Sequence, residues 1–573
     1  MTWFPAYPGD EPPDAISRSL EIAIAFHQRN ELAQASRVYR EILKRDPDHP
    51  DALQYLAAIC IQVGDLGEAE VLYKRAMQAE DCSCVVYANY GSVLHQSGRY
   101  DEAIANYEKA LAINPDYADA LYNLGNSLFA SGRFDAAIPR YESALALHPA
   151  HVGARYNLAN TLQKLNRHHE AITSYDMVAV LEPGHALACL NKGNALRALR
   201  LHEEALASYD RALSINRDFT DALCNRGGVL KDLKRFDEAL KSYLSALHID
   251  PKDAEIYWNI SLTLLLLGNF KEGFEFYEWR KKIRNPLGNR QFPKPLWLGQ
   301  DRLEGKTILI HEEQGIGDII QFCRYLKLLQ AQGAKVIFAV TPRLAALASS
   351  LGQGIEIRPI EEASSDFDFH CPLISLPHAL STDLTSIPSA TPYIFANGEQ
   401  VEKLRGELSR NGTRKICGLS WRSNNVATGD TRSIHLSDLF DKVDPRDYLF
   451  VNLQYGDVSG EIADLRARSG IEVISIAAID NYNDLDGFAA LVDACDVIVT
   501  IDNTTAHIAG ALNKRTYLML PHVPDWRWLL DREDSPWYPS LRLFRQPADG
   551  DWRSVFIALD QALREDADGA SQV

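Results

Sequence analysis

Two glycines followed by an aspartate form the first candidate for chemistry in this 573-residue chain. They lie in the segment 314–318 (QGIGD), after an apolar stretch typical of a strand and before one typical of a helix. Gly315 and Gly317 let the backbone turn tightly and approach a ligand at the helix N-terminus. The spacing is not a dinucleotide fingerprint, because Ile320 stands where a third small residue belongs, and it is not a P-loop. Asp318 is a candidate general base, and its alternative role is to cap the helix.

Arginines and amides follow a second predicted strand. The segment 421–425 (WRSNN) begins where an apolar stretch ends, and Arg432 follows in the segment 431–433 (TRS). Open α/β sheets bind ligands at this end of their strands. Arg422 and Arg432 could pair with phosphate or carboxylate oxygens, and the alternative is a solvated loop with surface arginines.

A third candidate site is the segment 502–507 (DNTTAH), which follows the very apolar Val497–Ile501. This order predicts a strand, a turn rich in capping residues, and a helix. The free N–H groups and the dipole at the start of a helix attract anions, and threonine hydroxyls add donors. The segment therefore predicts a phosphate or diphosphate site, with ordinary capping by Asp502 or Thr504 as the alternative.

The sequence offers little support for a metal site. The nine cysteines are scattered, and the close pair Cys82 and Cys84 has neither a second pair nor a histidine nearby. No acidic pair with D-x-D spacing occurs in the three segments above. We therefore expect chemistry without a metal or a resident cofactor, and reduced cysteines that are mostly buried.

From about residue 300 onward, short apolar segments alternate with amphipathic ones, for example Ile319–Gln332 and Leu485–Cys495. This alternation predicts parallel sheets joined by crossover helices. The region is long enough for two such domains, with the stretch Tyr393–Thr413 as their junction. The expected strands are Thr307–His311, Lys335–Val340, Phe367–Cys371, Lys415–Trp421, Leu449–Leu453 and Val497–Ile501.

The first half of the chain repeats every 34 residues. The repeated position is tyrosine: Tyr39, Tyr73, Tyr107, Tyr141, Tyr175, Tyr209, Tyr243 and Tyr277. The residue four positions earlier is always small: Ala35, Ala69, Ala103, Ala137, Ala171, Ala205, Ala239 and Gly273. Each unit is predicted to be two amphipathic helices, with the small residue allowing close approach and the tyrosine filling the space between units. Stacked units form a solenoid with a concave side.

An asparagine stripe repeats with the same period. Its members are Asn89, Asn123, Asn157, Asn191, Asn225 and Asn259, and three repeats add Asn126, Asn160 and Asn194 on the same helix face. Asparagine is a poor residue for a helix interior, and its amide can match a peptide bond in either direction. The stripe predicts a groove that binds a polypeptide by its backbone, beginning near the third repeat. In the alternative interpretation each asparagine bonds to the neighbouring repeat and only stiffens the solenoid.

Composition limits the class of partner. The net charge of −18 disfavours non-specific binding to nucleic acid, and the apolar fraction of 46% is ordinary for a globular protein. The N-terminal residues lack the basic and apolar regions of a secretory signal, and the most apolar window, Ile260–Leu267, is too short to span a bilayer. We expect a soluble, cytoplasmic protein without a membrane span and without a nucleic-acid partner.

Two resemblances follow from these patterns. The tyrosine and small-residue pattern resembles the tetratricopeptide repeat (TPR), over about residues 16 to 287. The segments HEEQGIGDIIQFCRYL, GLSWRSNN…TRSIHL, FVNLQ and LVDACDVIVTIDNTTAHIAGAL resemble, in order and spacing, GT-B glycosyltransferases of the heptosyltransferase-like group. This second resemblance spans roughly residues 305 to 550. It implies an α/β fold of two Rossmann-like domains facing a cleft, and an inverting, metal-independent transfer from a nucleotide-sugar.

The resemblance also implies roles for individual residues. Asp318 matches the proposed catalytic base, and Arg432 matches the basic residue that stabilises the leaving phosphate. The donor-binding residues implied are Gly315, Gly317, Trp421, Arg422, Gln454, Asp502, Asn503, Thr504, Thr505 and His507. The asparagine stripe resembles that of TPR-bearing protein O-glycosyltransferases, where it contacts the acceptor polypeptide.

A repeat array joined to this GT-B type resembles bacterial flagellin glycosyltransferases. The implied function is a protein O-glycosyltransferase, which moves a sugar such as a nonulosonic acid from a CMP or other nucleotide donor to Ser or Thr of a polypeptide such as flagellin. Two alternatives remain: transfer to lipopolysaccharide or a lipid-linked sugar, and a non-enzymatic TPR scaffold with a degenerate nucleotide-sugar domain.

The expected organisation has six parts. They are an extension at 1–15, eight repeats at 16–287, a linker at 288–304, an acceptor-side domain at 305–400, a donor-binding domain at 401–565 and a tail at 566–573.

Overall fold

The computed structural model describes residues 14–79, 82–284, 290–362, 366–410, 414–424 and 429–569. The chain divides into two compact units, Met1–Val229 and Leu230–Val573. The division falls inside helix α13 (Thr220–Asp232), in the seventh repeat, and not at the linker expected at 288–304.

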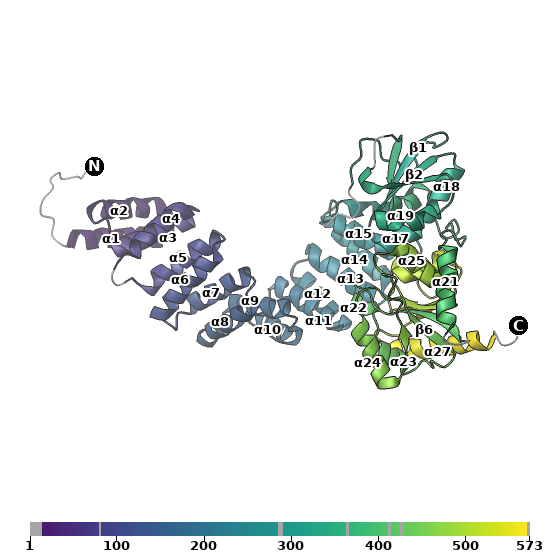
Figure 1. Ribbon diagram of the computed structural model, residues 1–573. Coiled ribbons are helices and arrows are strands. Elements are labelled where there is room, and N and C mark those ends of the chain that lie inside the picture. Colours follow the sequence, from purple (N-terminus) through teal and green to yellow (C-terminus); the bar gives the residue numbers. More distant parts are fainter. Residues whose placement is uncertain are drawn as a thin grey trace. The chain divides into compact units, whose positions relative to one another are not determined.

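The first unit is built from helical hairpins, and Figure 1 shows its helices as consecutive pairs coloured purple to blue. Before α13 they are α1 Asp14–Gln28, α2 Leu32–Arg45, α3 Pro50–Gln62, α4 Leu66–Ala76, α5 Cys84–Gln96, α6 Tyr100–Ile113, α7 Ala118–Ala130, α8 Phe134–Leu147, α9 Val152–Lys164, α10 His168–Leu181, α11 Ala186–Ala198 and α12 His202–Ile215. Three further helices complete the eight predicted hairpins: α14 Phe236–Ile249, α15 Ala254–Leu266 and α16 Phe270–Tyr277. The solenoid prediction is confirmed.

The tyrosine and small-residue stripe of the second helices is buried, and several of its tyrosines also meet glycines of the first helix of their repeat. All eight tyrosines are at most 2% exposed, and the seven alanines are fully buried. A Cβ atom added to Gly125 would lie 2.6 Å from the ring of Tyr141, and one added to Gly193 would lie 2.5 Å from that of Tyr209. These distances are too short for any side chain, so the glycine allows the tyrosine ring to pack against the helix backbone.

The second unit contains a first parallel sheet in the order β3-β2-β1-β4. Its strands are β1 Thr307–His311, β2 Lys335–Val340, β3 Ile355–Pro359 and β4 Phe369–Pro372. Its helices are α17 Ile316–Phe322, α18 Leu326–Ala331, α19 Pro342–Ser349 and α20 Leu376–Ala379. The single helix expected at Ile319–Gln332 is interrupted by a 3-10 turn, Cys323–Tyr325, where Arg324 is buried and bonds to the carbonyl of Trp537.

The second sheet is also parallel, in the order β10-β9-β8-β5-β6-β7. Counted from β5, this is the 3-2-1-4-5-6 order of a doubly wound fold, in which the topological switch lies between β5 and β8. Its strands are β5 Lys415–Ser420, β6 Tyr448–Asn452, β7 Val473–Ile474, β8 Val497–Ile501, β9 Thr516–Leu520 and β10 Leu541–Arg545. Its helices are α21 Gly398–Ser409, α22 Gly429–Arg432, α23 Leu436–Phe440, α24 Ser459–Ser469, α25 Leu485–Ala494, α26 Thr504–Ala511 and α27 Trp552–Gly569.

The six expected strands are present within two residues of their predicted bounds, and four further strands (β3, β7, β9 and β10) were not predicted. Strand β3 carries Glu356 and Arg358 at the edge of its sheet, and β7 has two residues, so neither shows a long apolar pattern. Helix α21 occupies most of the junction expected at Tyr393–Thr413, of which residues 411–413 lie outside the described ranges.

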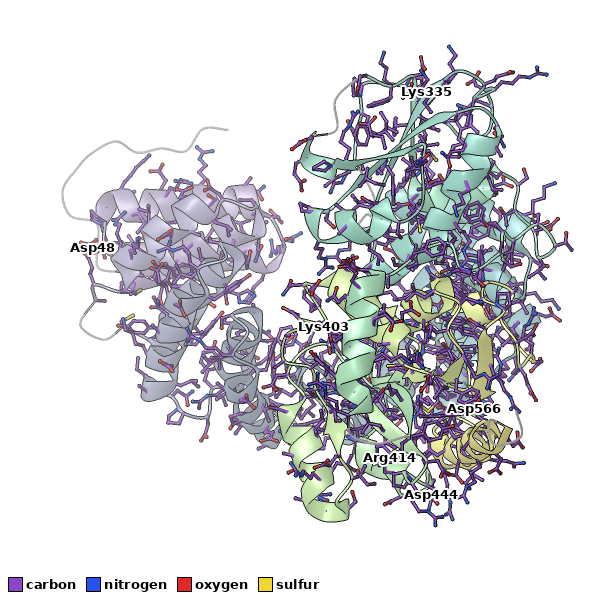
Figure 2. The ribbon with its side chains drawn as sticks, turned by 45° about the vertical axis from the view of Figure 1, so that its right-hand side comes forward. Asp48, Lys335, Lys403, Arg414, Asp444 and Asp566 are labelled. Carbon is purple, nitrogen blue, oxygen red and sulfur yellow. The ribbon has the colours of Figure 1, made fainter. Side chains whose placement is uncertain are left out.

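Two expected boundaries differ from the structure. Residues 285–289 of the linker region lie outside the described residues, but Trp297 is buried and its N–H donates to the carbonyl of His370 in β4 (2.9 Å). Helix α27 runs to Gly569, past the expected start of the tail, and its Asp566, labelled in Figure 2, accepts a hydrogen bond from Tyr448 (3.2 Å). Both segments are therefore packed parts of the second unit.

The last repeat shares its core with the α/β part. Phe270, Phe274 and Tyr277 of α16 belong to the same buried cluster as Trp526 and Trp537. The eighth hairpin is thus part of the second unit's core and not of a separable array.

Within the described ranges, no helix is both long enough and apolar enough to cross a membrane.

Candidate functional site

A cavity of about 830 Å³ lies at the carboxyl ends of strands from both parallel sheets. Gly315 and Ile316, after β1, and Thr504 and Thr505, after β8, line it with the N-terminal ends of helices α17 and α26. Helix N-termini present free N–H groups and the positive end of the helix dipole. The cavity therefore has two helix ends suited to an anionic group.

Amides form a second part of the wall, at the end of β6 and in the loops that follow β6 and β7. Asn452, Gln454 and Asn481 line the cavity. The Oε1 atom of Gln454 accepts the backbone N–H groups of Trp421 (2.9 Å) and Arg422 (2.8 Å). Gln454, expected to bind the donor, thus lines the cavity and also fixes the loop after β5.

The rest of the wall includes aromatic rings and one arginine. The rings of Tyr455 and Tyr482 lie 6.3 Å apart between centroids, and Arg343 of α19 lies 4.8 Å from the ring of Tyr482. Aromatic faces beside a few polar groups are typical of pockets for small molecules. The mixture suits a ligand with a flat ring and several hydroxyl or amide groups.

The cap of α26 is neither of the two residues that the capping alternative named. Asn503 is the N-cap, and its Oδ1 accepts the N–H of Thr505 (3.0 Å), so neither Asp502 nor Thr504 caps this helix. The Oγ1 atom of Thr505 is buried and has no hydrogen-bond partner among the described residues. This hydroxyl remains available for a ligand in the cavity that Thr505 lines.

Asp318 does not line the cavity, and its carboxylate has two partners. Its Oδ2 accepts the N–H of Gly315 (3.0 Å), and its Oδ1 is paired with Arg527. The capping alternative is therefore present: Asp318 is the third residue of α17 and bonds back to the residue before the helix. About 21% of its side chain is exposed, so the carboxylate remains reachable.

Arg432 belongs to a buried chain of alternating charges. Its Nη1 lies 2.8 Å from Asp502 Oδ2, and its Nη2 lies 3.5 Å from Asp525 Oδ2. Asp525 in turn accepts from Arg527 Nη1 (2.8 Å), which connects this chain to Asp318. Burial raises the pKa of Asp502, whereas for Asp525 the nearby Arg527 and Arg432 overcome burial and bring its pKa down to about 2.

The two arginines predicted from the sequence have different environments. The surface-arginine alternative is wrong for Arg432, whose side chain is 16% exposed, and it describes Arg422, whose side chain is 52% exposed. Arg422 Nη1 lies 3.7 Å from Glu461. Neither arginine lines the cavity among the described residues.

His507, Gly317 and Trp421, expected to bind the donor, are packing residues. His507 is buried, its Nδ1 is 2.9 Å from the hydroxyl of Tyr538, and burial lowers its pKa to about 3. A Cβ atom on Gly317 would lie 2.8 Å from the His507 ring, so this pair brings α17 and α26 together. Trp421 is 1% exposed and donates its Nε1 hydrogen to Glu461 (2.9 Å).

Of the predicted donor-binding residues, Gly315, Gln454, Thr504 and Thr505 line the cavity. Sequence reasoning missed Asp525 and Arg527, which follow β9, a strand that was not recognised. A charged D-W-R-W segment, separated by four residues from the apolar stretch that ends at Leu520, could have revealed them. No group of three or more potential metal-ligating side chains is close enough to hold a metal within the described part of the chain.

The asparagine stripe bonds across neighbouring repeats. Asn126 Oδ1 accepts from the hydroxyl of Tyr141 (2.9 Å) and from Asn157 Nδ2 (2.9 Å). Asn160 accepts in the same way from Tyr175 (2.6 Å) and Asn191 (3.0 Å).

Asn194 repeats this arrangement with Tyr209 (2.8 Å) and Asn225 (2.9 Å). The stiffening alternative is therefore present in these repeats. All nine stripe asparagines, including Asn89, Asn123 and Asn259, are half-buried, so binding of a polypeptide stays a prediction.

Comparison with known proteins identifies the repeats. Family models described as "TPR repeat" match residues 91–129 and 227–268, and models described as "tetratricopeptide repeat" match 26–81, 122–186 and 156–222. Protein FlbA of Caulobacter vibrioides is 30% identical over 336 residues, which are 55% of this chain and 56% of that protein. The chain thus spans about half the length of this curated relative.

Solved repeat proteins match over about a third of the chain. YrrB, a TPR protein with an unusual peptide-binding site, is 25% identical, with a TM-score of 0.30 over 32% of this chain and 95% of its own. MamA is 24% identical, with a TM-score of 0.29 over 30% of this chain and 94% of its own. The family models and the sixteen paired helices together show that the N-terminal solenoid of this chain consists of tetratricopeptide repeats.

Proposed function

We propose that this chain is a protein O-glycosyltransferase of the GT-B type, which transfers a sugar from a nucleotide donor to a Ser or Thr side chain of a polypeptide. The observation that carries the proposal is the cavity at the carboxyl ends of two parallel sheets, lined by two helix N-termini. Such a cavity is where doubly wound folds bind nucleotides.

The donor fits the wall by chemical class. The N-terminus of α26 and the unpartnered hydroxyl of Thr505 would bind phosphate oxygens. The amides of Asn452 and Asn481 and the rings of Tyr455 and Tyr482 would contact the nucleoside and the sugar.

Asp318 is the proposed general base. In the reaction the acceptor oxygen bonds to the anomeric carbon, while the bond from that carbon to the donor phosphate breaks and its electron pair leaves with the phosphate. The proton of the acceptor hydroxyl passes to Asp318. Each carboxylate oxygen has two lone pairs, so the bonds to Arg527 and Gly315 leave capacity for this proton.

The repeats supply the acceptor side of the proposal. TPR arrays are scaffolds that bind polypeptides, and the asparagine stripe has amides that are half-exposed. Flagellin is the proposed acceptor, and a CMP-linked nonulosonic acid is the first donor to test.

The test is transfer by the full chain, measured by mass spectrometry of a flagellin acceptor with CMP-, UDP- and GDP-linked sugars in turn. Asp318→Asn is expected to reduce the rate at least about 100-fold, because general bases contribute about 10² to 10⁴. Asp301→Asn, which changes an exposed carboxylate in the same unit, is the matched control and should keep full activity.

Three results would contradict parts of the proposal. An unchanged rate in Asp318→Asn would exclude Asp318 as the base. Labelling of glycolipid in membrane extracts without labelling of protein would indicate a lipid-linked acceptor. Binding of nucleotide-sugar without turnover would indicate a scaffold.

A further inference from the structure

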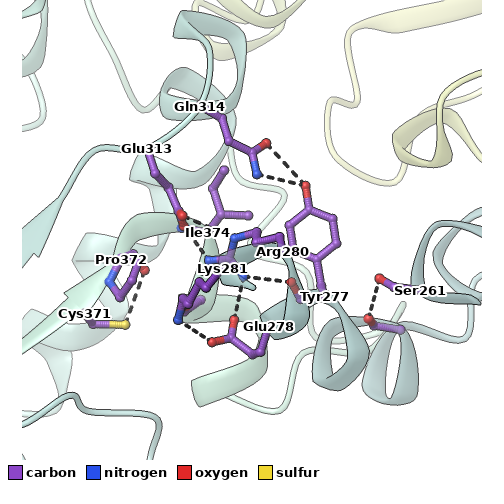
Figure 3. A network of polar contacts seen from close by, with 12 residues as sticks. Ser261, Tyr277, Glu278, Arg280, Lys281, Glu313, Gln314, Cys371, Pro372 and Ile374 are labelled. Carbon is purple, nitrogen blue, oxygen red and sulfur yellow. Dashed lines mark hydrogen bonds and ion pairs between the residues drawn. The ribbon is translucent and has the colours of Figure 1, made fainter. Parts of the chain in front are cut away.

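A fully buried arginine follows the last repeat helix. Arg280 lies in the 3-10 turn η1 (Glu278–Lys281) after α16 and is 0% exposed (Figure 3). Its Nη2 donates to Glu313 Oε1 (2.6 Å) and to the hydroxyl of Ser375 (2.8 Å), and its Nε donates to Glu313 Oε2 (3.2 Å). Its Nη1 donates to the carbonyl of Tyr277 (3.1 Å) and to Glu278 (2.8 Å).

Glu313, the partner of this arginine, immediately precedes the segment 314–318. The Glu313 carboxylate is fully buried and also accepts the N–H of Ile374 (3.0 Å). Burial raises its pKa, while the charge of Arg280 opposes that effect. A buried charge of this kind needs its partner, so the two chain segments are held together at this point.

A second contact joins the same two segments. The hydroxyl of Tyr277, the repeat tyrosine of the eighth hairpin, lies 3.3 Å from both Oε1 and Nε2 of Gln314 (Figure 3). Gln314 has a φ of +63°, a conformation that side-chain-bearing residues adopt rarely. The surrounding contacts must therefore hold the backbone directly before Gly315, which lines the cavity.

Arg527, the ion-pair partner of Asp318, is also positioned by this hairpin. Trp526 packs its ring against Phe270, Phe274 and Tyr277, at centroid distances of 6.1, 5.6 and 6.2 Å. The next residue, Arg527, lies over the Trp526 ring (4.5 Å) and pairs with Asp318. The last hairpin thus contacts both segments that meet at the Asp318 carboxylate.

We propose that Tyr277 and Arg280 of the last repeat hairpin are positioning residues of the candidate site, which fix the segment 313–318 and through it Asp318 and the N-terminus of α17. Neither residue lines the cavity. The inference rests on the proposed function for its activity measurement, and its structural measurement is independent of that function.

The structural test is hydrogen–deuterium exchange on the full chain, followed in peptides that cover residues 312–322. Arg280→Gln and Tyr277→Phe are expected to raise the exchange rate of these amides, about 10-fold for Arg280→Gln. Arg284→Gln, which changes an exposed arginine four positions later, is the matched control and should leave the rate unchanged.

Since Arg280→Gln leaves Glu313 buried without its partner, a second variant guards against general unfolding. The double variant Arg280→Met with Glu313→Leu removes both charges at similar volume, which is often neutral for stability. It loses the bonds to Ser375, Ile374 and the Tyr277 carbonyl, so exchange at 312–322 should still increase while β5 to β10 stay protected.

The activity measurement separates positioning from folding. Where the wild-type chain transfers sugar, Arg280→Gln and the double variant should each lower kcat at least 10-fold and change the KM for the donor less than twofold. Unchanged exchange at 312–322, or an equal increase throughout the second unit, would overturn the inference. Absence of transfer in the wild type would contradict the proposed function alone, because the exchange result would still stand.

Discussion

At the residue scale, the candidate site is organised by a chain of alternating charges. Asp318, Arg527, Asp525, Arg432 and Asp502 follow one another as ion-pair partners. Charges removed from water are stable when they are paired and hydrogen-bonded. The two arginines of this chain, Arg527 and Arg432, are therefore needed for the fold.

We predict that Arg527→Gln destabilises the second unit by about 3 kcal/mol, because removing one partner leaves buried carboxylates with less compensation. Arg532→Gln, which breaks a partly exposed pair with Asp534 (2.6 Å), should cost less than about 1 kcal/mol. Urea unfolding followed by tryptophan fluorescence measures this, since eight of the nine tryptophans lie in this unit. Equal effects of the two variants would contradict the prediction.

Two buried histidines make the second unit sensitive to acid. Burial lowers the pKa of His311 and of His507 from the usual 6.5 to about 3. The unfolded chain therefore takes up these protons first as the pH falls. Their contribution to stability is fully present above about pH 6.5 and declines toward pH 3, by up to about 1.4 kcal/mol per pH unit for each histidine.

We expect His311→Phe to flatten this decline between pH 6.5 and 4.5, because an apolar ring at a buried site takes up no proton. The imidazole Nε2 of His311 has no partner among the described residues, and its Nδ1 lies 3.4 Å from the carbonyl of Glu312, so the substitution gives up only this long hydrogen bond. The urea midpoint at several pH values is the measurement, and exposed His169→Gln is the control. A fall of the urea midpoint with pH as steep as that of the wild type would argue against a lowered pKa of His311.

At the element scale, several repeats bring the backbone of one helix against the tyrosine ring of the next. Gly193 of α11 and Tyr209 of α12 form such a contact, in which an added Cβ would lie 2.5 Å from the ring. Glycine is unfavourable in a helix by about 1 kcal/mol relative to alanine. The close packing must therefore outweigh the propensity.

Gly193→Ala is accordingly expected to destabilise its repeat by about 1 to 3 kcal/mol, the usual range for overpacking. Gly67→Ala, at an exposed position of α4 with 3.7 Å to its nearest atom, should be neutral or stabilising. Hydrogen exchange in α11 and α12 measures the local effect. Stabilisation by Gly193→Ala would show that the backbone can move away from the ring.

The asparagine stripe provides a further prediction at this scale. Asn160→Ala removes one acceptor from Tyr175 and one from Asn191, which keep Gln163 and Tyr156 as partners, and we expect a loss of about 1 kcal/mol. Asn123→Ala is the comparison. The residue 31 positions before Asn123 is Ser92 and not an asparagine, so Asn123 lacks the asparagine acceptor of the later repeats and its loss should cost less. Thermal unfolding by circular dichroism compares them, and equal small effects would favour a role in recognition alone.

At the scale of the whole molecule, the repeats do not end where the α/β part begins. Helices α14 to α16 belong to the second unit, and Phe270 stacks on Trp537 at 5.7 Å between centroids. Without α15 and α16, Trp526 would lose its contacts with Phe270, Phe274 and Tyr277, and Trp537 would lose its contact with Phe270.

We predict that a fragment of residues 220–573 folds, whereas a fragment of 305–573, cut at the boundary expected from the sequence, does not. The reason is the loss of the shared apolar core and of the Arg280–Glu313 pair. Near-ultraviolet circular dichroism and a cooperative urea transition distinguish the two. A cooperative transition in the shorter fragment would show that the last hairpin is dispensable.

The sequence by itself determined the repeat number, the buried tyrosine and small-residue contacts, and the strands β1, β2 and β8, whose bounds agree with the prediction. These features depend on apolar periodicity within short segments, which any single sequence displays. The strands β3 and β7 were missed because edge strands with charges or with two residues carry no such signal.

Only the tertiary structure decided which polar groups meet. Asp318 and Arg527 are 209 residues apart. The sequence alone allowed Asn126 either to face a ligand or to bond to Tyr141 and Asn157, and the structure shows these two bonds. The same holds for Arg280 and Glu313, which join the last repeat to the segment before Gly315. A hydrogen bond or ion pair between distant segments forms only where the fold brings the donor and acceptor atoms to about 3 Å from each other. Local sequence does not encode that approach.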